Sequence, residues 1–341
     1  MTLAGLPTLE HGREQIRKIL REMVDRLDPT IRRVVSYHFG WCDERGAVLD
    51  ADGGKAVRPG LVLLCAEASG ADPREALPGA VAVELVHNFS LVHDDLMDRD
   101  VRRRHRPTVW ALWGDAVAVL AGDAMLSLAH EVLLGCESPH AAAAQSVIAV
   151  ATRELIRGQA ADTAFENRND VSLDECLAMA WDKTAALMAA SAVTGAVLGG
   201  ATPPVRDALG AYGGHLGLAF QLVDDLLGVW GRPEVTGKPV YSDLRSAKKT
   251  LPVTWSIQNG GPAGRELAAC LAAPGRAATA TDDDLAVLAG LIERAGGRAW
   301  AEQEARRRVA LALDALAGVG IPSAPAFQLQ ALAHYLVDRE A

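Results

Sequence analysis

Apolar residues recur at spacings of three and four along most of the chain, the pattern of helices that bury one face. The pattern predicts helices over residues 9–35, 58–69, 78–97, 109–134, 141–163, 172–198, 204–229, 251–258, 282–316 and 325–340. No alternating stretch typical of a strand runs longer than four residues. We therefore predict an all-α protein of ten or more helices. Several of these helices are apolar all round, so we expect them to be buried.

Composition agrees with a helical fold. Alanine and leucine dominate and aromatic residues make up only 5%, which favours helix over strand. Half of the 341 residues are hydrophobic, enough for a large core, and this length allows either two domains or one large helical domain. Because no segment resembles a flexible linker, we expect one domain over 1–341. Its motif-bearing core spans about 53–252 and its helical C-terminal part about 253–341.

Charge and cysteine usage exclude several classes of function. The net charge is −9 and the longest basic run is 102–104, so we expect no nucleic-acid partner. Five scattered cysteines without CxxC spacing indicate buried thiols in a reducing compartment. The N-terminus does not resemble a signal peptide, and the longest uncharged stretch, 184–205, predicts a buried helix and a turn. A cytoplasmic protein without a transmembrane segment is expected.

Two acidic clusters, about 130 positions apart, interrupt otherwise apolar helical segments. On a helix Asp94 and Asp98 share one face, where like charges repel unless a cation lies between them. The second cluster forms one stripe along its helix: Gln221, Asp224, Asp225 and Gly228. Two carboxylate stripes facing each other would hold divalent cations, most naturally Mg²⁺, with room for a phosphate-bearing ligand.

Basic residues accompany both clusters. Lys55 and Arg58 follow a glycine turn at a helix start, where they oppose the helix dipole but suit the binding of an anion. Other cations follow the first cluster or lie farther along: Arg102, Arg103, Arg104, Arg106, Lys183, Lys238 and Lys248. His87 lies on the helix face of Asp94. These charges suit two polyphosphate groups, one held through Mg²⁺ and one bound directly.

Simpler interpretations exist for each residue taken alone. A single acidic motif is usually a solvated face, His87 could be a core histidine, and Lys183 could be a surface lysine. Gln159 and Asp162 fit a surface salt-bridge face as well as a cavity wall. The basic segment 232–249 follows the second cluster and contains glycine and prolines, so we interpret it as a lid.

The ordered motifs resemble those of trans-isoprenyl diphosphate synthases, the family of farnesyl and geranylgeranyl diphosphate synthases. The resemblance covers about 53–252 and is carried by GGK…RP ending at Pro59, HNFSLVHDDLMD at 87–98, RRHRPT at 103–108, GQ…D at 158–162, KT at 183–184, FQLVDD at 220–225, TGKP at 236–239 and DLRSAKKTLP at 243–252. It implies an all-α bundle of the isoprenoid synthase type around a deep central cavity, usually in a homodimer.

The resemblance also implies roles for individual residues. Asp94 and Asp98 would bind Mg²⁺ directly and Asp224 would bind it from the opposite wall, with three ions per site, while Asp95 and Asp225 would support these ligands. The residues that match the isopentenyl diphosphate site are Lys55, Arg58, His87 and Arg104. Those that match the allylic diphosphate site are Arg103, Lys183, Thr184, Gln221, Lys238 and Lys248. Gln159 and Asp162 match a motif that lines the same cavity.

The implied reaction is a head-to-tail condensation of isopentenyl diphosphate with an allylic diphosphate. Phe89 and Ser90, one turn before the first motif, would form the floor beneath the growing chain. An aromatic residue there resembles members that stop at geranylgeranyl diphosphate; farnesyl diphosphate or another length is the alternative. A class I terpene cyclase or a non-catalytic prenyltransferase subunit is a more remote alternative. A cyclase would lack the second diphosphate site, and such a subunit typically lacks the aspartates.

Three positions depart from the family pattern. Gly228 stands where many members have aspartate, Tyr241 where a small residue is usual, and His105 where glycine is frequent. None of them removes a charge that the mechanism needs, so we expect an active enzyme.

Overall fold

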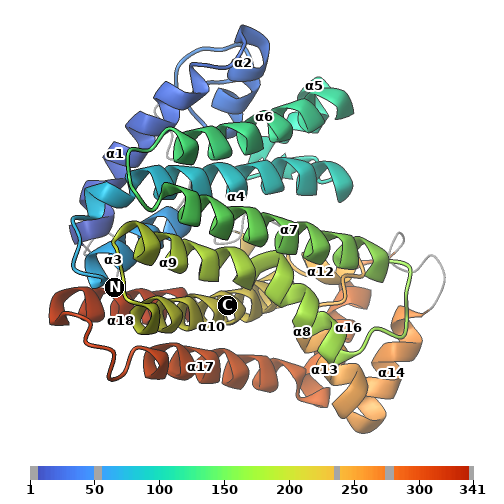
Figure 1. Ribbon diagram of the computed structural model, residues 1–341. Coiled ribbons are helices and arrows are strands. Elements are labelled where there is room, and N and C mark those ends of the chain that lie inside the picture. The colour runs from blue at the N-terminus through green and yellow to red at the C-terminus, as the bar shows by residue number, and fades with distance from the viewer. Residues whose placement is uncertain (1–6, 50–55, 234–238, 273–279, 338–341) are drawn as a thin grey trace. The chain divides into compact units, whose positions relative to one another are not determined.

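The computed structural model describes residues 7–49, 56–233, 239–272 and 280–337 (Figure 1). The first half contains α1 (Pro7–Val24), α2 (Pro29–His38), α3 (Val57–Ala68), η2 (Pro73–Ala76), α4 (Leu77–Met97), β1 (Arg102–Arg103), β2 (Arg106–Pro107), α5 (Val109–Trp113), α6 (Asp115–Leu134) and α7 (Ala141–Phe165). The second half contains α8 (Leu173–Ala180), η3 (Trp181–Ala185), α9 (Ala186–Leu198), α10 (Pro203–Trp230), α12 (Ser242–Arg245), α13 (Leu251–Asn259), α14 (Gly261–Leu271), α16 (Asp282–Ala295), α17 (Gly297–Ala315) and α18 (Ser323–Val337). The predicted all-α class is confirmed, since the described residues form only one small antiparallel hairpin, β1–β2.

Three of the predicted long helices are wrong because each is two helices. The segment 9–35 breaks at Asp28, whose carboxylate accepts hydrogen bonds from Thr30 N (2.9 Å) and Ile31 N (3.3 Å) and so caps α2. The segments 109–134 and 282–316 break at Gly114 (φ 84°) and Gly296 (φ 88°), a conformation that glycine adopts without steric cost.

One helix is missing from the sequence-based prediction, and the predicted start of another lies within one residue of the observed one. The helix α14 was not predicted, because the Asn-Gly-Gly-Pro sequence that begins it indicates a turn. The predicted helix over 204–229 is confirmed as α10, which begins one residue earlier, at Pro203, because proline is tolerated in the first turn of a helix.

The described chain clusters into two compact units, and the long helices α7 and α10 contribute to both. The first unit is Met1–Thr152, Leu187–Gly213 and Ala315–Leu332. Within it α4 packs closely against α6, along which Gly122 leaves room for the ring of His93, and α3 packs against α4 (Figure 1). The expected boundaries of one domain over 1–341 stay a prediction.

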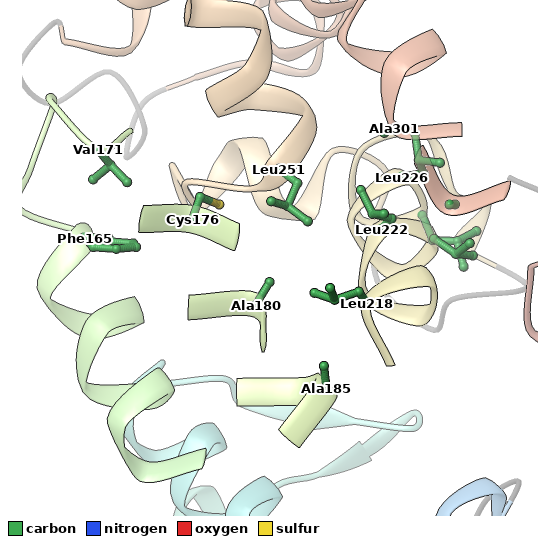
Figure 2. Packing of buried hydrophobic residues seen from close by; sticks show 13 residues of the cluster. Phe165, Val171, Cys176, Ala180, Ala185, Leu218, Leu222, Leu226, Leu251 and Ala301 are labelled. Carbon is green, nitrogen blue, oxygen red and sulfur yellow. The ribbon is translucent and has the colours of Figure 1, made fainter. Parts of the chain in front are cut away.

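The second unit is Arg153–Ala186, Gly214–Asp314 and Ala333–Ala341. One of its apolar clusters joins α8 and η3 to α10 and α13, through residues such as Cys176, Ala185, Leu222 and Leu251 (Figure 2). A second cluster lies among α12, α13, α14 and α16 and includes Leu244. These clusters hold the helices that carry Lys183 and the second acidic motif.

Candidate active site

The first acidic motif lies at the C-terminal end of α4. The backbone N–H of Asp98 donates to the carbonyl of Asp94 at 2.8 Å, so the two residues stand one turn apart, as the spacing predicts. Both side chains are partly exposed, whereas Asp95 between them is buried. The carboxylates of Asp94 and Asp98 therefore reach the surface of this unit.

Arg103 joins the hairpin to this motif. Its Nε donates to Asp95 Oδ1 at 2.7 Å and its Nη2 lies 3.6 Å from Asp94 Oδ2. Burial raises the pKa of Asp95 to about 6, although the Arg103 guanidinium opposes that shift. Arg103 therefore pairs with both carboxylates, the buried one of Asp95 and the partly exposed one of Asp94.

The turn between β1 and β2 carries Arg104 and His105 in the left-handed region, with φ of 51° and 64°. A side chain at position 105 is therefore strained, and glycine would adopt this conformation without that cost. Arg106 in β2 donates to the carbonyls of Tyr37 (2.9 Å) and Cys42 (2.8 Å). These hydrogen bonds tie the hairpin to the end of α2 and to the segment that follows it, so the Arg106 side chain has a structural role.

Arg58 and His87 meet, as their assignment to one substrate site requires. Arg58 Nη1 lies 3.3 Å from His87 Nε2, and since a guanidinium only donates, the imidazole nitrogen is the acceptor. Burial, followed by the charges of Arg58, Arg104 and Arg103, lowers the pKa of His87 well below its usual value. The ring is therefore neutral here and has one nitrogen left to donate from.

Sequence reasoning missed a polar network directly behind these residues. Asn88 Oδ1 lies 3.1 Å from His38 Nε2, and Asn88 Nδ2 donates to the Glu84 carbonyl (2.8 Å) and carboxylate (2.9 Å). Burial raises the pKa of Glu84 and the charges of Arg58 and Arg104 oppose this, so the carboxylate balances both guanidiniums. The sequence contained a sign of this network, because Glu84 and Asn88 are polar residues four positions apart in an apolar helical segment.

Two of the predicted phosphate ligands, Lys55 and Lys238, lie outside the described residues. The adjoining Ala56 has φ of 47° and precedes α3, so Arg58 lies in the first turn of that helix as expected. The central part of the predicted lid, residues 234–238, is also outside the described part.

Phe89 is buried, with 4% of its surface exposed, and packs edge to face against His93 with 5.5 Å between ring centroids. His93 Nε2 lies 3.1 Å from the carbonyl of Val119 in α6, and a Cβ on Gly122 would overlap the His93 ring. Ser90 Oγ donates to the carbonyl of His87 at 2.8 Å. The position of Phe89 is thus set by the close approach of α6 to α4.

In the second unit, three predicted residues form one hydrogen-bonded chain. Thr184 Oγ1 donates to Gln221 Oε1 at 2.6 Å, and Gln221 Nε2 donates to Asp225 Oδ1 at 2.7 Å. Asp225 Oδ2 accepts from the backbone N–H of Leu251 at 2.9 Å. Burial raises the pKa of Asp225 to about 7, while these hydrogen bonds oppose the rise. The chain fixes the Thr184 hydroxyl and the Gln221 amide relative to α10.

Lys183 and Asp162 also meet, because Lys183 Nζ lies 2.6 Å from Asp162 Oδ2. The neighbouring Gln159 is buried, and its Nε2 has no hydrogen-bond partner within the described part of the chain. A buried donor without a partner is costly. Gln159 therefore fits a residue that donates to a ligand better than a solvated salt-bridge face.

The departure at position 228 has a structural explanation. A Cβ at Gly228 would fall within 2.9 Å of Asp243 Oδ1 and closer to the rest of that carboxylate. Asp243 therefore fills the space that a third aspartate would need on α10. Asp224 on the same helix is partly exposed, and Lys248 is placed by its N–H, which donates to the Asp243 carbonyl at 2.9 Å.

The departure at position 241 affects the start of α12. Tyr241 adopts φ of 63° and ψ of 24°, the left-handed conformation that a glycine adopts easily. Its side chain packs at the edge of the apolar cluster that includes Leu244. The packing compensates for the strained backbone.

Comparison with known proteins decides the family. The model of the polyprenyl synthetases matches residues 41–286, most of the chain. The chain belongs to the polyprenyl synthetase family. This family of trans-isoprenyl diphosphate synthases includes a (2E,6E)-farnesyl diphosphate synthase of Mycobacterium tuberculosis that is 68% identical over all of this chain and 95% of that protein. A polyprenyl synthetase of Streptomyces coelicolor, known from its crystal structure, has a TM-score of 0.92 at 50% identity, covering 97% of this chain and 98% of the other.

A second crystal structure is that of a geranylgeranyl pyrophosphate synthase of Corynebacterium glutamicum, complexed with isoprenyl diphosphate and magnesium. It has a TM-score of 0.86 at 29% identity and covers 97% of this chain and 99% of that one. The isoprenoid synthase fold that the motifs predict is therefore confirmed, and the protein is a trans-prenyltransferase.

The carboxylates of this polyprenyl synthetase fit a metal that shares its coordination with a substrate. Within the described residues, no group of three or more His, Cys, Asp or Glu side chains forms a ready-made metal cage. Mg²⁺ is usually bound through one or two carboxylates, with phosphate oxygens and water completing its shell. The partly exposed Asp94 and Asp98 match that arrangement.

One described helix of this synthetase, α6, is long and apolar enough to cross a membrane by length and composition. Only 44% of its most apolar window is buried, and Val119 and Leu120 are 42% and 55% exposed. A single such helix is weak support for a membrane span, because core helices pass the same test. Its packing against α4 shows that it is a part of the first unit.

Proposed function

We propose that the protein condenses isopentenyl diphosphate with an allylic diphosphate. The observation that carries this proposal is the presence of two separate groups of cationic and hydrogen-bonding side chains. Arg58, His87 and Arg104 form one group around a buried carboxylate. Lys183 belongs to the other, with Asp162. Two diphosphates need two such groups, whereas a terpene cyclase needs only one.

Isopentenyl diphosphate is assigned to the first group. Arg58 and Arg104 supply the fixed charge and the planar donors that suit phosphate oxygens. The neutral His87 adds a donor without competing for a proton. Lys55 would complete the group. The carboxylate of Glu84 interacts with the charges of Arg58 and Arg104 and so offsets the repulsion between these two guanidiniums.

The allylic diphosphate is assigned to Lys183, Lys238, Lys248 and Arg103, with Thr184 and Gln221 close to its first carbon. Its C–O bond breaks with the electron pair leaving on diphosphate, and the double bond of isopentenyl diphosphate attacks the allylic carbon to form the new C–C bond. A proton then leaves the isopentenyl unit for the departing diphosphate. Thr184 Oγ1 and Gln221 Oε1, which lie 2.6 Å apart, present oxygen dipoles that stabilise positive charge on carbon.

Mg²⁺ held by Asp94, Asp98 and Asp224 would neutralise charge on the leaving diphosphate, and three ions are proposed. Asp95 and Asp225 are proposed to support these ligands. Each carboxylate is fixed by a hydrogen bond, from Arg103 Nε for Asp95 and from Leu251 N for Asp225. The segment 232–249 is proposed to close over the site and exclude water, which would otherwise trap the cation as an alcohol.

The product length requires a revision of the expectation from sequence. The prediction of geranylgeranyl diphosphate is not confirmed, since the M. tuberculosis relative that is 68% identical over the whole chain makes farnesyl diphosphate. We therefore place farnesyl diphosphate first. Geranylgeranyl diphosphate remains the second candidate, because the buried ring of Phe89 occupies the position from which it was predicted.

The exposed apolar residues Val119 and Leu120 of α6 support a homodimer that covers this face. Light scattering at micromolar concentration tests the dimer directly.

All five cysteines are free thiols, which fits the reducing cytoplasm.

Mass analysis of products from dimethylallyl, geranyl and farnesyl diphosphate with isopentenyl diphosphate and Mg²⁺ tests the proposed function. Farnesyl diphosphate from the first two primers, with little extension of the third, supports the first candidate. Efficient conversion of the third primer to a twenty-carbon product supports the second. Cyclised or hydrolysed products without elongation would overturn the proposed function.

A further inference from the structure

The residues Lys183 and Thr184 lie on a π-helical turn, η3 (Trp181–Ala185), inserted between α8 and α9. A π-turn is a locally unfavourable winding that persists only where other contacts hold it, and it is often found at functional sites. The backbone of η3 therefore needs an external support, and the structure shows where that support is.

The support comes from one stretch of α7. Arg157 forms a two-pronged ion pair with Asp182: Nε to Oδ2 and Nη2 to Oδ1, each 2.5 Å. Asp182 is buried, with 8% of its surface exposed, whereas the Arg157 side chain is 64% exposed. Neither residue is among those assigned to a substrate or to the metal, so the pair has no direct role in the proposed chemistry.

The next residue of α7, Gly158, makes the second contact. A Cβ at this position would lie only 2.8 Å from both the Asp182 carbonyl carbon and the Lys183 Cα. The α7 backbone therefore passes directly against the backbone of the π-turn, and only glycine permits this. One helical turn after Gly158, Asp162 binds the Lys183 ammonium at 2.6 Å.

We propose that Arg157, Gly158 and Asp182 are positioning residues that clamp the π-turn to α7 and so aim Lys183 and Thr184 at the allylic diphosphate. The inference rests on the proposed function and adds to it the part of the fold that sets the geometry of the allylic site. Arg157 and Asp182 are assigned to neither substrate. They act through the backbone at 182–184, which carries the ammonium of Lys183 and the hydroxyl that bonds Gln221.

Kinetic constants measured separately for the two substrates distinguish a positioning role from a general loss of structure. Residues assigned to isopentenyl diphosphate (Arg58, His87 and Arg104) lie on α3, α4 and the β-hairpin, none of which belongs to the clamp. Loosening the clamp therefore changes the allylic site alone. A displacement of about 1 Å at a reacting group reduces the rate by up to about a hundredfold.

The experiment measures steady-state kinetics with both substrates for R157A, R157K and G158A. We expect kcat/KM for the allylic substrate to fall at least about tenfold in R157A and G158A, with the KM for isopentenyl diphosphate changed less than about twofold. R157K keeps the charge but cannot form the two-pronged pair, so it should recover part of the loss.

The matched control is R307A. Arg307 forms the same two-pronged pair with Glu304 (2.6 and 2.7 Å), on α17, with similar exposure of both side chains. Its kinetics should match wild type, and thermal unfolding of R157K and R307A should show both to be folded.

The results separate this inference from the proposed function. Turnover by the wild-type protein tests the proposed function, whereas the ratio of kcat/KM for the allylic substrate between variant and wild type tests the clamp. The clamp is overturned if R157A and G158A keep wild-type kcat/KM for the allylic substrate, or if the KM for isopentenyl diphosphate rises as much as the KM for the allylic substrate. Calorimetric binding of inorganic pyrophosphate with Mg²⁺ compares the affinity of the variants with that of wild type without turnover. Weaker binding in G158A supports the clamp, and unchanged binding contradicts it.

Discussion

The carboxylate of Asp243, which precedes Leu244 in α12, packs directly against the bare Cα of Gly228 in α10. The contact joins the end of the second acidic motif to the segment that is proposed to close the site. It leaves no room for the aspartate that many relatives carry at position 228.

Replacing Gly228 by Ala or Asp should therefore destabilise the protein. The new Cβ overlaps the Asp243 carboxylate, and overpacking of this kind reduces the free energy of unfolding by about 1–3 kcal/mol. Denaturant unfolding of G228A, D243A and the double variant measures the coupling between the two sites. If the two effects are simply additive, the contact does not explain the glycine.

Replacing Asp94 or Asp224 by Ala should lower kcat by on the order of a thousandfold, because each removes a charge proposed to hold Mg²⁺ at the leaving group. Far-UV circular dichroism should be unchanged, since both side chains are partly exposed on helices. The control is D207A, which removes an exposed carboxylate near the start of α10. Full activity in either D94A or D224A would remove the proposed mechanism.

Replacing Phe89 by Ala should lengthen the products by at least one five-carbon unit if this ring is the floor of the chain site. The substitution also leaves a cavity, which reduces the free energy of unfolding by about 3–5 kcal/mol. The assay is therefore run well below the unfolding temperature of F89A. Product masses from F89A are compared with those from F327A, which removes a ring that is 62% exposed. An unchanged product distribution in F89A would reject the assignment.

The stability of the protein should fall as the pH drops from 6.5 toward 3, in part because of His38. Burial is the largest cause that lowers the His38 pKa to about 3, followed by the charges of Arg104 and Arg103; the bond to Asn88 opposes the shift and Arg106 adds to it. Since the unfolded chain binds the proton near pH 6.5 and the folded chain does not, the stability is fully present above 6.5.

The variant H38Q keeps a donor for Asn88 and removes this titration. We expect the difference in unfolding free energy between wild type and H38Q to change by up to about 1.4 kcal/mol per pH unit below 6.5. Denaturant titrations at pH 7.5, 6.0 and 5.0 measure it. Parallel pH profiles for the two proteins would show that His38 is not the group responsible.

The helical fold and the shared face of Asp94 and Asp98 were predictable because they depend on local patterns. Apolar spacing reveals helix faces, and Asp94 and Asp98 share a face in any helix. The helix breaks at Pro29, Gly114 and Gly296 were also signalled locally. They were missed because the apolar period runs on through each break.

The sequence by itself determined the helices, the two acidic motifs and the family. Tertiary structure alone decided which side chains support them, because these partners are distant along the chain: Asn88 meets His38, Asp243 fills the space beside Gly228, and Arg157 holds Asp182. The π-turn at Trp181–Ala185 is likewise a feature that only the tertiary structure reveals. The apolar pattern of residues 172–198 gives no sign of this winding, whereas in the structure the α7 backbone packs directly against it at Gly158.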